Sequence, residues 1–176
     1  CSLALGETIC FEGHKSMEVG HFYFLDNQYY QDFNDDKLMS NHEIVNGKIH
    51  DRPCYCCIDT SDSNIYWVIP ISSQVEKYRK IYNKKISKNG KCDTIDFGKV
   101  LGAERAFLIQ NMCPVTDKYI KNEYQHLGSP VAIDYTTYKR IVSKATKVSA
   151  LVHNNNSHLI FPDVLKIEKT LKAKNK

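Results

Sequence analysis

The sequence predicts an α+β fold, a compact and antiparallel β-barrel-like sheet with surrounding helices. Strand-like segments dominate the first half of the 176-residue chain and helical patterns dominate the second half, with one helix inserted between the strands. This order is typical of α+β proteins, whereas alternating strands and helices would indicate a parallel sheet. The length corresponds to one domain, which we assign to residues 17–176.

Residues 1–16 fit this domain poorly. They lack the basic start of a secretory signal, and Met17 precedes a clear strand at residues 22–25. We therefore expect Met17 to be the natural start and residues 1–16 to be a non-native or flexible extension. The alternative is a native segment that packs as an additional arm.

Composition is that of a soluble globular protein, with 42% hydrophobic and 25% charged residues and a net charge of +4. No apolar run approaches the roughly 20 residues of a membrane-spanning helix. The seven cysteines are odd in number and include no C-x-x-C pair. We therefore expect reduced thiols and a cytoplasmic protein, with neither a zinc site nor a disulfide framework.

The predicted pairing of strands in the first half of the chain indicates which polar side chains lie close together. Residues 26–33 form a short helix or turn, and Asn46-Gly47 predicts a hairpin between apolar flanks. Residues 52–58 and 65–71 read as an antiparallel pair of strands. That pairing brings the start of the first strand, with His50 and Arg52, close to the end of the second.

A serine pair follows that second strand. The apolar run ends at Pro70, and Ser72 and Ser73 lead into a helical segment. Ser73 and Glu76 fit the S-x-x-E capping box. Free N–H groups and the helix dipole also make such a helix start a natural anion site. The alternative is that the serines only cap the helix.

The inserted helix, residues 74–87 with Asn89-Gly90 at its end, is strongly basic. Its cations and those just after it are Lys77, Arg79, Lys80, Lys84, Lys85, Lys88 and Lys91. Together with the serine pair they indicate a phosphodiester partner, although a cationic helix face can also be merely solvated.

The second half completes the predicted elements. Residues 95–100 and 106–109 form strands, a short helix follows Thr116 or Asp117, and residues 129–133 form another strand. Asp134 or Thr136 caps a long helix with an apolar stripe, and the last helix runs from about residue 161 to residue 171.

Metal and cofactor motifs are missing from the sequence. There is no Gly-rich phosphate loop, and the acidic residues are scattered instead of clustered for magnesium. We expect no cofactor. Phosphodiester chemistry here would then be metal-independent, which RNA permits because its 2′-hydroxyl is an internal nucleophile.

Several segments together resemble a known family. They are the aromatic strand at residues 22–25 with Tyr29, Tyr30 and Phe33, the Arg52-Pro53 strand start, residues 67–73, and residues 107–112 with Pro114. In residues 17–165 the chain is similar to the type III toxin–antitoxin toxins of the ToxN, AbiQ and CptN group, and most similar to the CptN branch.

The resemblance implies a metal-independent endoribonuclease toxin that cuts adenine-rich RNA and leaves a 2′,3′-cyclic phosphate. It implies inhibition by a pseudoknotted RNA antitoxin, which the toxin cuts from a repeated precursor. It also implies a closed protein–RNA assembly with several toxin copies and a role in phage defence, with no membrane partner.

The resemblance also implies site residues. Ser72 and Ser73 match the family's active-site pair, and Arg52 matches a basic residue that would stabilise phosphorane charge. His50 is a candidate general base, because its ordinary pKa lies near neutrality; the alternative is a surface histidine in a turn. Some members of the family have a lysine two residues after the serines, and that position is Val75 here.

A cation could still reach the site from Lys77 or Lys118. The expected RNA-binding residues are Lys77, Arg79, Lys80, Lys84, Lys85, Lys118 and Tyr119. Further candidates for stacking on bases are Tyr29, Tyr55, Tyr78 and Tyr82, although the last two also fit the apolar stripe of the basic helix.

Two other functions are compatible with the sequence. A non-catalytic module that binds structured RNA needs the same basic helix as a ribonuclease. A protein-interaction domain with an incidental lysine face is the third candidate.

Overall fold

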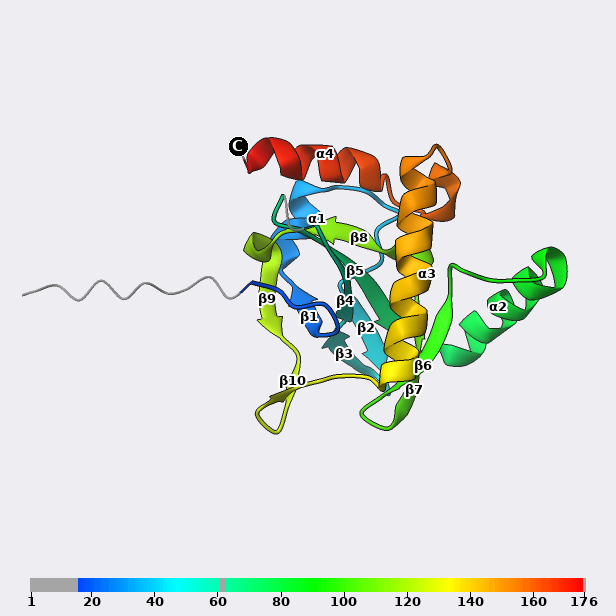
Figure 1. The fold of residues 1–176 in the computed structure, drawn as a ribbon. Helices are drawn as coiled ribbons and strands as arrows, with labels where there is room; N and C mark the ends of the chain where they lie inside the picture. Colours follow the sequence, from blue (N-terminus) through cyan, green and yellow to red (C-terminus); the bar gives the residue numbers. More distant parts are fainter. Residues whose placement is uncertain (1–15, 61–62, 176) are drawn as a thin grey trace, which may run out of the picture.

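The computed structural model describes residues 16–60 and 63–175 (Figure 1). The expectation for residues 1–16 therefore lies almost entirely outside the described residues. The strands are β1 (Phe22–Leu25), β2 (His42–Val45), β3 (Lys48–Asp51), β4 (Pro53–Thr60), β5 (Ile65–Ser72), β6 (Asp96–Val100), β7 (Ala103–Phe107), β8 (Cys113–Val115), β9 (Ile120–Glu123), β10 (Gln125–His126) and β11 (Ser129–Pro130). The helices are α1 (Asn27–Asp32), α2 (Val75–Asn89), α3 (Tyr135–His153) and α4 (Val164–Lys174), with short 3₁₀ turns at Ile109–Asn111, Asp117–Tyr119 and Ser157–Leu159.

The main sheet is antiparallel and runs in the order β6-β7-β5-β4-β1-β9, with β8 also paired to β5. Strands lead and helices follow along the chain, so the predicted α+β class is confirmed. Among the described residues β6 and β9 end the path without pairing to each other, so the sheet is barrel-like but not closed.

Strand β5 is the centre of the sheet, and all eight of its residues are buried. It pairs with β4 along one side, which confirms the predicted antiparallel pair. On the other side it pairs first with β8, through Tyr66–Val68, and then with β7, where Ser72 faces Ala106. The serine pair therefore lies where β5 leaves the sheet beside β7.

Helices α3 and α4 cover the sheet, α3 lying along it and α4 across one end (Figure 1). The apolar stripe of α3 is buried at Ile141, Ala145, Val148 and Val152. Asp134 caps this helix by accepting a hydrogen bond from the Thr137 N–H. A smaller apolar cluster lies under α2, and includes the fully buried Ile95.

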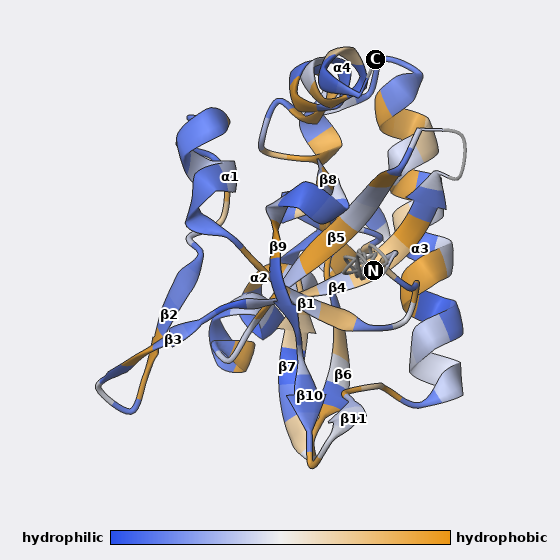
Figure 2. Cartoon of the chain, turned by 90° about the vertical axis from the view of Figure 1, so that its left-hand side faces the viewer, coloured by the Kyte–Doolittle hydropathy of each residue, from blue (hydrophilic) through white to orange (hydrophobic). Residues whose placement is uncertain are grey.

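The β2–β3 hairpin turns at Asn46-Gly47, as predicted, and projects from the rest of the chain (Figure 2). Both turn residues have positive φ, 51° and 74°, which Asn and Gly tolerate best. Ile44 and Ile49 face each other across this hairpin and are 70% and 73% exposed.

Two predictions about α2 had different outcomes. Gly90 ends the helix with φ of 72°, and its N–H donates to the Ile86 carbonyl, as expected. The predicted Ser73–Glu76 capping box is wrong. The N-cap residue is Gln74, and its side chain makes no capping hydrogen bond.

Five cysteines lie in the described residues, and all five are free and buried. None of the helices in residues 16–60 and 63–175 has the length and apolar character needed to cross a membrane.

Candidate active site

Arg52 joins the β2–β3 hairpin to the main sheet. The residue is 4% exposed. Its Nε–H donates to the Ser40 carbonyl at 2.7 Å, Nη1 donates to the Ile71 carbonyl at 2.8 Å, and Nη2 reaches the His42 carbonyl at 3.4 Å. Backbone oxygens on both sides of the guanidinium therefore hold the hairpin against the end of β5.

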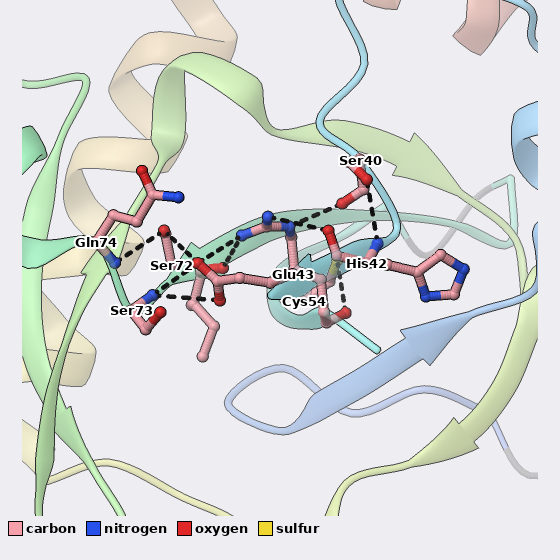
Figure 3. Close-up of polar contacts among 9 residues, drawn as sticks. Ser40, His42, Glu43, Cys54, Ser72, Ser73 and Gln74 are labelled. Atoms are coloured by element: carbon pink, nitrogen blue, oxygen red, sulfur yellow. Dashed lines mark hydrogen bonds and ion pairs between the residues drawn. The ribbon is translucent and has the colours of Figure 1, made fainter. Parts of the chain in front are cut away.

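Glu43 is the acidic partner of this arrangement (Figure 3). One carboxylate oxygen accepts hydrogen bonds from Ser72 Oγ at 2.7 Å and from the Ser73 N–H at 3.1 Å. The same oxygen lies 3.6 Å from Arg52 Nη1, and the Glu43 side chain is 9% exposed. The protein's own carboxylate thus takes up the Ser73 N–H, one residue before the N-cap Gln74 of α2, close to where the sequence predicted an anion site.

The two serines have different environments. Ser72 is 1% exposed. It donates to Glu43 and accepts a hydrogen bond from the Gln74 N–H at 3.1 Å. Ser73 is half-buried and lines a pocket. Ser72 is thus a fixed internal group, and Ser73 is the serine that a ligand in this pocket can reach.

This pocket has a volume of about 660 Å³. Its polar lining side chains are Glu43, His50, Asp51, Ser73 and Arg105, and its apolar and aromatic lining includes Phe24, Val45, Ile49, Pro53, Ile71 and Tyr124. A larger pocket of about 810 Å³, lined by residues 35–37 and parts of residues 152–165, contains none of the predicted site residues.

His50 lies directly opposite Glu43 in the β2–β3 hairpin and lines the same pocket as Ser73. The side chain is exposed. The predicted proximity of His50 and Arg52 to the serine pair is therefore present. His50 lines the pocket, whereas Arg52 is not among the lining residues.

Tyr78, on the first turn of α2, is 6% exposed and belongs to the core, as its place in the apolar stripe predicted. Burial raises its pKa, Arg52 opposes the shift and Glu43 adds to it. The tyrosine therefore lies near the Arg52–Glu43 pair from the α2 side.

Two cations of α2 are engaged within the protein. Lys85 Nζ donates to Thr94 Oγ1 at 2.7 Å and to Gln110 Oε1 at 2.9 Å, and burial lowers its pKa. Arg79 pairs with Glu104 and lies 3.7 Å from the centre of the Phe97 ring. Arg79 therefore holds α2 against the β6–β7 hairpin, whereas Lys85 holds α2 against the residues that flank this hairpin on either side.

The other cations expected to bind RNA, Lys77, Lys80, Lys84 and Lys118, are exposed. None of these four lysines is among the residues that line the pocket with Ser73.

Tyr119 is not available to a nucleic-acid base, which corrects its expected RNA-binding role. It is 1% exposed, its ring packs against Tyr29 and Phe33, and its hydroxyl donates to Asp32 at 2.6 Å. Tyr29 and Tyr55 are also fully buried.

The sequence analysis missed Glu43, Arg105 and Tyr124. For Glu43 a signal was present. A two-residue Asn46-Gly47 turn sets Val45 opposite Lys48, and therefore Glu43 opposite His50. No local pattern in the sequence indicated Arg105 or Tyr124, because β7 brings Arg105 and the link between β9 and β10 brings Tyr124 to the pocket from distant parts of the chain.

Within the described part of the chain, no cluster of three or more His, Cys, Asp and Glu side chains has the arrangement of a metal site.

Fold and site together describe an α+β protein with a serine pair, a buried Arg–Glu pair and a pocket at one end of its central strand. Among solved structures, the chain is similar to AbiQ, a lactococcal anti-phage endoribonuclease belonging to the type III toxin–antitoxin system. The TM-score is 0.54 at 17% sequence identity, over 90% of this chain and 96% of AbiQ, which establishes a shared fold. No protein-family model and no curated protein matches the sequence.

Proposed function

We propose that this protein is a metal-independent endoribonuclease toxin of a type III toxin–antitoxin system. The shared fold with AbiQ supports this function. The observation that carries it is the common pocket of Ser73 and His50, because this pocket unites the resemblance-derived serine with a titratable group. The sequence similarity to the CptN branch is part of the same proposal.

The reaction is attack of a ribose 2′-oxygen on the adjacent phosphorus. The 2′-hydroxyl proton passes to a base, the bond from phosphorus to the 5′-oxygen breaks, and the departing 5′-oxygen takes up a proton. The products are a 2′,3′-cyclic phosphate and a 5′-hydroxyl end. The protein must hold a base near the 2′-hydroxyl and donors near the phosphate oxygens.

The pocket residues suit these roles. His50 receives the 2′-hydroxyl proton, since an imidazole nitrogen can accept a proton as a general base. Ser73 hydrogen-bonds to the phosphate. Ser72 and Glu43 position Ser73, because Glu43 bonds both to the Ser72 hydroxyl and to the Ser73 N–H.

The role proposed for Arg52 changes. Three carbonyl oxygens and Glu43 surround its guanidinium, which is almost wholly buried. We assign Arg52 to positioning the β2–β3 hairpin, in place of direct contact with the phosphorane.

The biological setting follows the same resemblance. The target is adenine-rich RNA, and the inhibitor is a pseudoknotted RNA antitoxin processed from a repeated precursor. Several toxin copies and RNA units form a closed assembly in the cytoplasm and act in phage defence. The exposed lysines Lys77, Lys80 and Lys84 on α2 and Lys118 supply the cationic surface for RNA.

A non-catalytic module for structured RNA is the second candidate. It is favoured by the location of these four lysines, which lie outside the lining of the Ser73 pocket. A binding surface of this kind would work without the pocket.

The test is incubation with adenine-rich RNA in excess EDTA, with end mapping and an assay for 2′,3′-cyclic phosphate. We expect site-specific cutting that survives EDTA, disappears in Ser73→Ala and persists in Ser87→Ala, which removes an exposed hydroxyl near the end of α2. Intact RNA with tight, salt-sensitive binding would favour the binding module. Cutting that EDTA abolishes would contradict metal independence.

A further inference from the structure

Arg105 lies on β7 across from the serine pair. Ile71 faces Phe107 and Ser72 faces Ala106 in the β5–β7 register. Carried one residue further, this register sets Ser73 opposite Arg105. Directly opposed residues of an antiparallel pair have side chains on the same face, and both Ser73 and Arg105 line the pocket.

The charges of the pocket leave Arg105 as its available cation. Glu43 is paired with Arg52 at 3.6 Å. Asp51 lies 2.7 Å from Lys121 Nζ and 3.0 Å from His42 Nδ1. Both acidic groups therefore have basic partners that are not part of the pocket lining.

Among the residues that the structure describes, the Arg105 guanidinium has no such carboxylate partner. One of its nitrogens donates to the Glu104 carbonyl at 2.9 Å. Over residues 16–60 and 63–175 it forms no ion pair with an Asp or Glu side chain. Most of its five N–H donors are thus available to an anion in the pocket, and the guanidinium fork matches two phosphate oxygens.

We propose that Arg105 is a catalytic residue, the cation that contacts the scissile phosphodiester. The assignment rests on the proposed ribonuclease function and supplies the charge that neither buried Arg52 nor Val75 provides. The phosphate lies between Ser73 and Arg105. The guanidinium stabilises the negative charge on the non-bridging oxygens as the 2′-oxygen bond forms, and it transfers no proton.

The aromatic lining indicates where a base next to this phosphate would lie. Phe24 and Tyr124 have ring centres 5.1 Å apart and both line the pocket. A base next to the scissile phosphate would contact these rings, since stacking on aromatic side chains is a common means of binding unpaired bases. The pocket therefore receives a single-stranded nucleotide unit instead of a paired one.

The experiment compares wild type with Arg105→Gln, Arg105→Lys and a matched control, Lys99→Ala. Lys99 is an exposed cation on the neighbouring strand, paired with Glu104 in register, so its side chain lies on the opposite sheet face from Arg105. Cleavage of adenine-rich RNA is measured at saturating protein, and thermal unfolding shows whether each variant is folded. Binding of the 2′-deoxy version of the same oligonucleotide is measured at several salt concentrations.

We expect Arg105→Gln to lower the cleavage rate by about 10²–10³-fold, the usual cost of one lost donor to a developing oxyanion. Arg105→Lys keeps the charge and recovers part of the rate, and Lys99→Ala cuts at the wild-type rate. The slope of log affinity against log salt should fall by about 0.7 in Arg105→Gln.

Wild-type cutting and salt dependence in Arg105→Gln would overturn the role of Arg105 and leave the ribonuclease function intact. Absence of cutting by wild type, with a reduced salt slope in Arg105→Gln, would overturn the enzyme function and keep the phosphate contact. Absence of both cutting and binding by wild type would overturn both.

Discussion

Glu43 and Ser72 are 29 residues apart in sequence, and a carboxylate oxygen of one lies 2.7 Å from the hydroxyl oxygen of the other. This contact ties the projecting β2–β3 hairpin to the end of the central strand. The hairpin, which carries His50, is therefore connected to the serine pair. Arg52 strengthens this connection through its contacts with Glu43 and with the Ile71 carbonyl.

Removing the Glu43 carboxylate should destabilise the protein. In Glu43→Ala the Ser72 hydroxyl and Ser73 N–H lose their acceptor and Arg52 loses its counter-charge. We expect the free energy of unfolding to fall by about 1–3 kcal/mol, with a smaller loss in Glu43→Gln. Denaturation with guanidinium chloride measures this free energy. Glu76→Ala, at an exposed position, serves as the control and should change stability by about 0.5 kcal/mol. An unchanged midpoint for Glu43→Ala would refute the structural role.

Adjacent lysines on α2 should separate stability from RNA affinity. Lys85→Ala leaves the buried Thr94 and Gln110 oxygens without their donor and should cost about 1–3 kcal/mol of unfolding free energy. Lys84→Ala removes an exposed cation and should change stability by less than about 0.5 kcal/mol. Under the proposed function it should also lower the salt slope of RNA binding by about 0.7. The reverse pattern would show that the two roles are misassigned.

Tyr119 controls the titration of Asp32. The hydroxyl hydrogen bond from Tyr119, followed by that from Gln28, lowers the pKa of Asp32 to about 2. Tyr119→Phe keeps the buried ring and should raise this pKa toward 3.8, the ordinary value. Carboxyl NMR titration tests this, with Asp134 as internal control because its lowered pKa comes mainly from Thr137.

The same shift predicts a pH dependence of stability. A carboxyl whose pKa is lower in the folded state contributes stability above its unfolded pKa. The Asp32 contribution is therefore present above pH 3.8 and is lost as the pH falls through about 2. Tyr119→Phe should lose less stability than wild type over this window. Equal losses in acid denaturation would contradict the role of this hydrogen bond in lowering the pKa of Asp32.

Gly98 allows β6 to lie close to α3. A Cβ atom at this position would lie 2.7 Å from Thr137 Cγ2 and 3.2 Å from Phe107 Cε2. Gly98→Ala should therefore cost about 1–3 kcal/mol through overpacking. Thr137→Ser removes the nearer methyl group, so adding it to Gly98→Ala should recover part of the loss. A double-mutant cycle by chemical denaturation measures this coupling, and strict additivity would exclude a direct clash.

Local signals in the sequence were sufficient for much of the fold. Asn46-Gly47, Asn89-Gly90 and Asp134 each set backbone geometry through their own chemistry, and the hairpin turn, the helix end and the helix start occur where they were expected. The β4–β5 pairing followed from two apolar segments separated by a polar turn.

Tertiary contacts decided the rest. The start of α2 departs from the capping box because Glu43, distant in sequence, takes the N–H of Ser73. Residue type identified Arg52 and Lys85 as cations, but only the assembled fold surrounds them with carbonyl and side-chain oxygens. The position of Arg105 beside the serine pair depends on the β5–β7 register, which no local sequence pattern predicts.

The buried thiols can report on the order in which the two apolar clusters of this protein unfold. Cys56, Cys57 and Cys113 lie in the main core, whereas Cys92 lies in the smaller cluster under α2. Burial raises the pKa of Cys56 to about 12 and that of Cys113 to about 11, so folded thiols are poor nucleophiles. With Cys1 and Cys10 replaced by serine, the rate at which each remaining thiol reacts with an alkylating reagent shows which apolar cluster becomes exposed first.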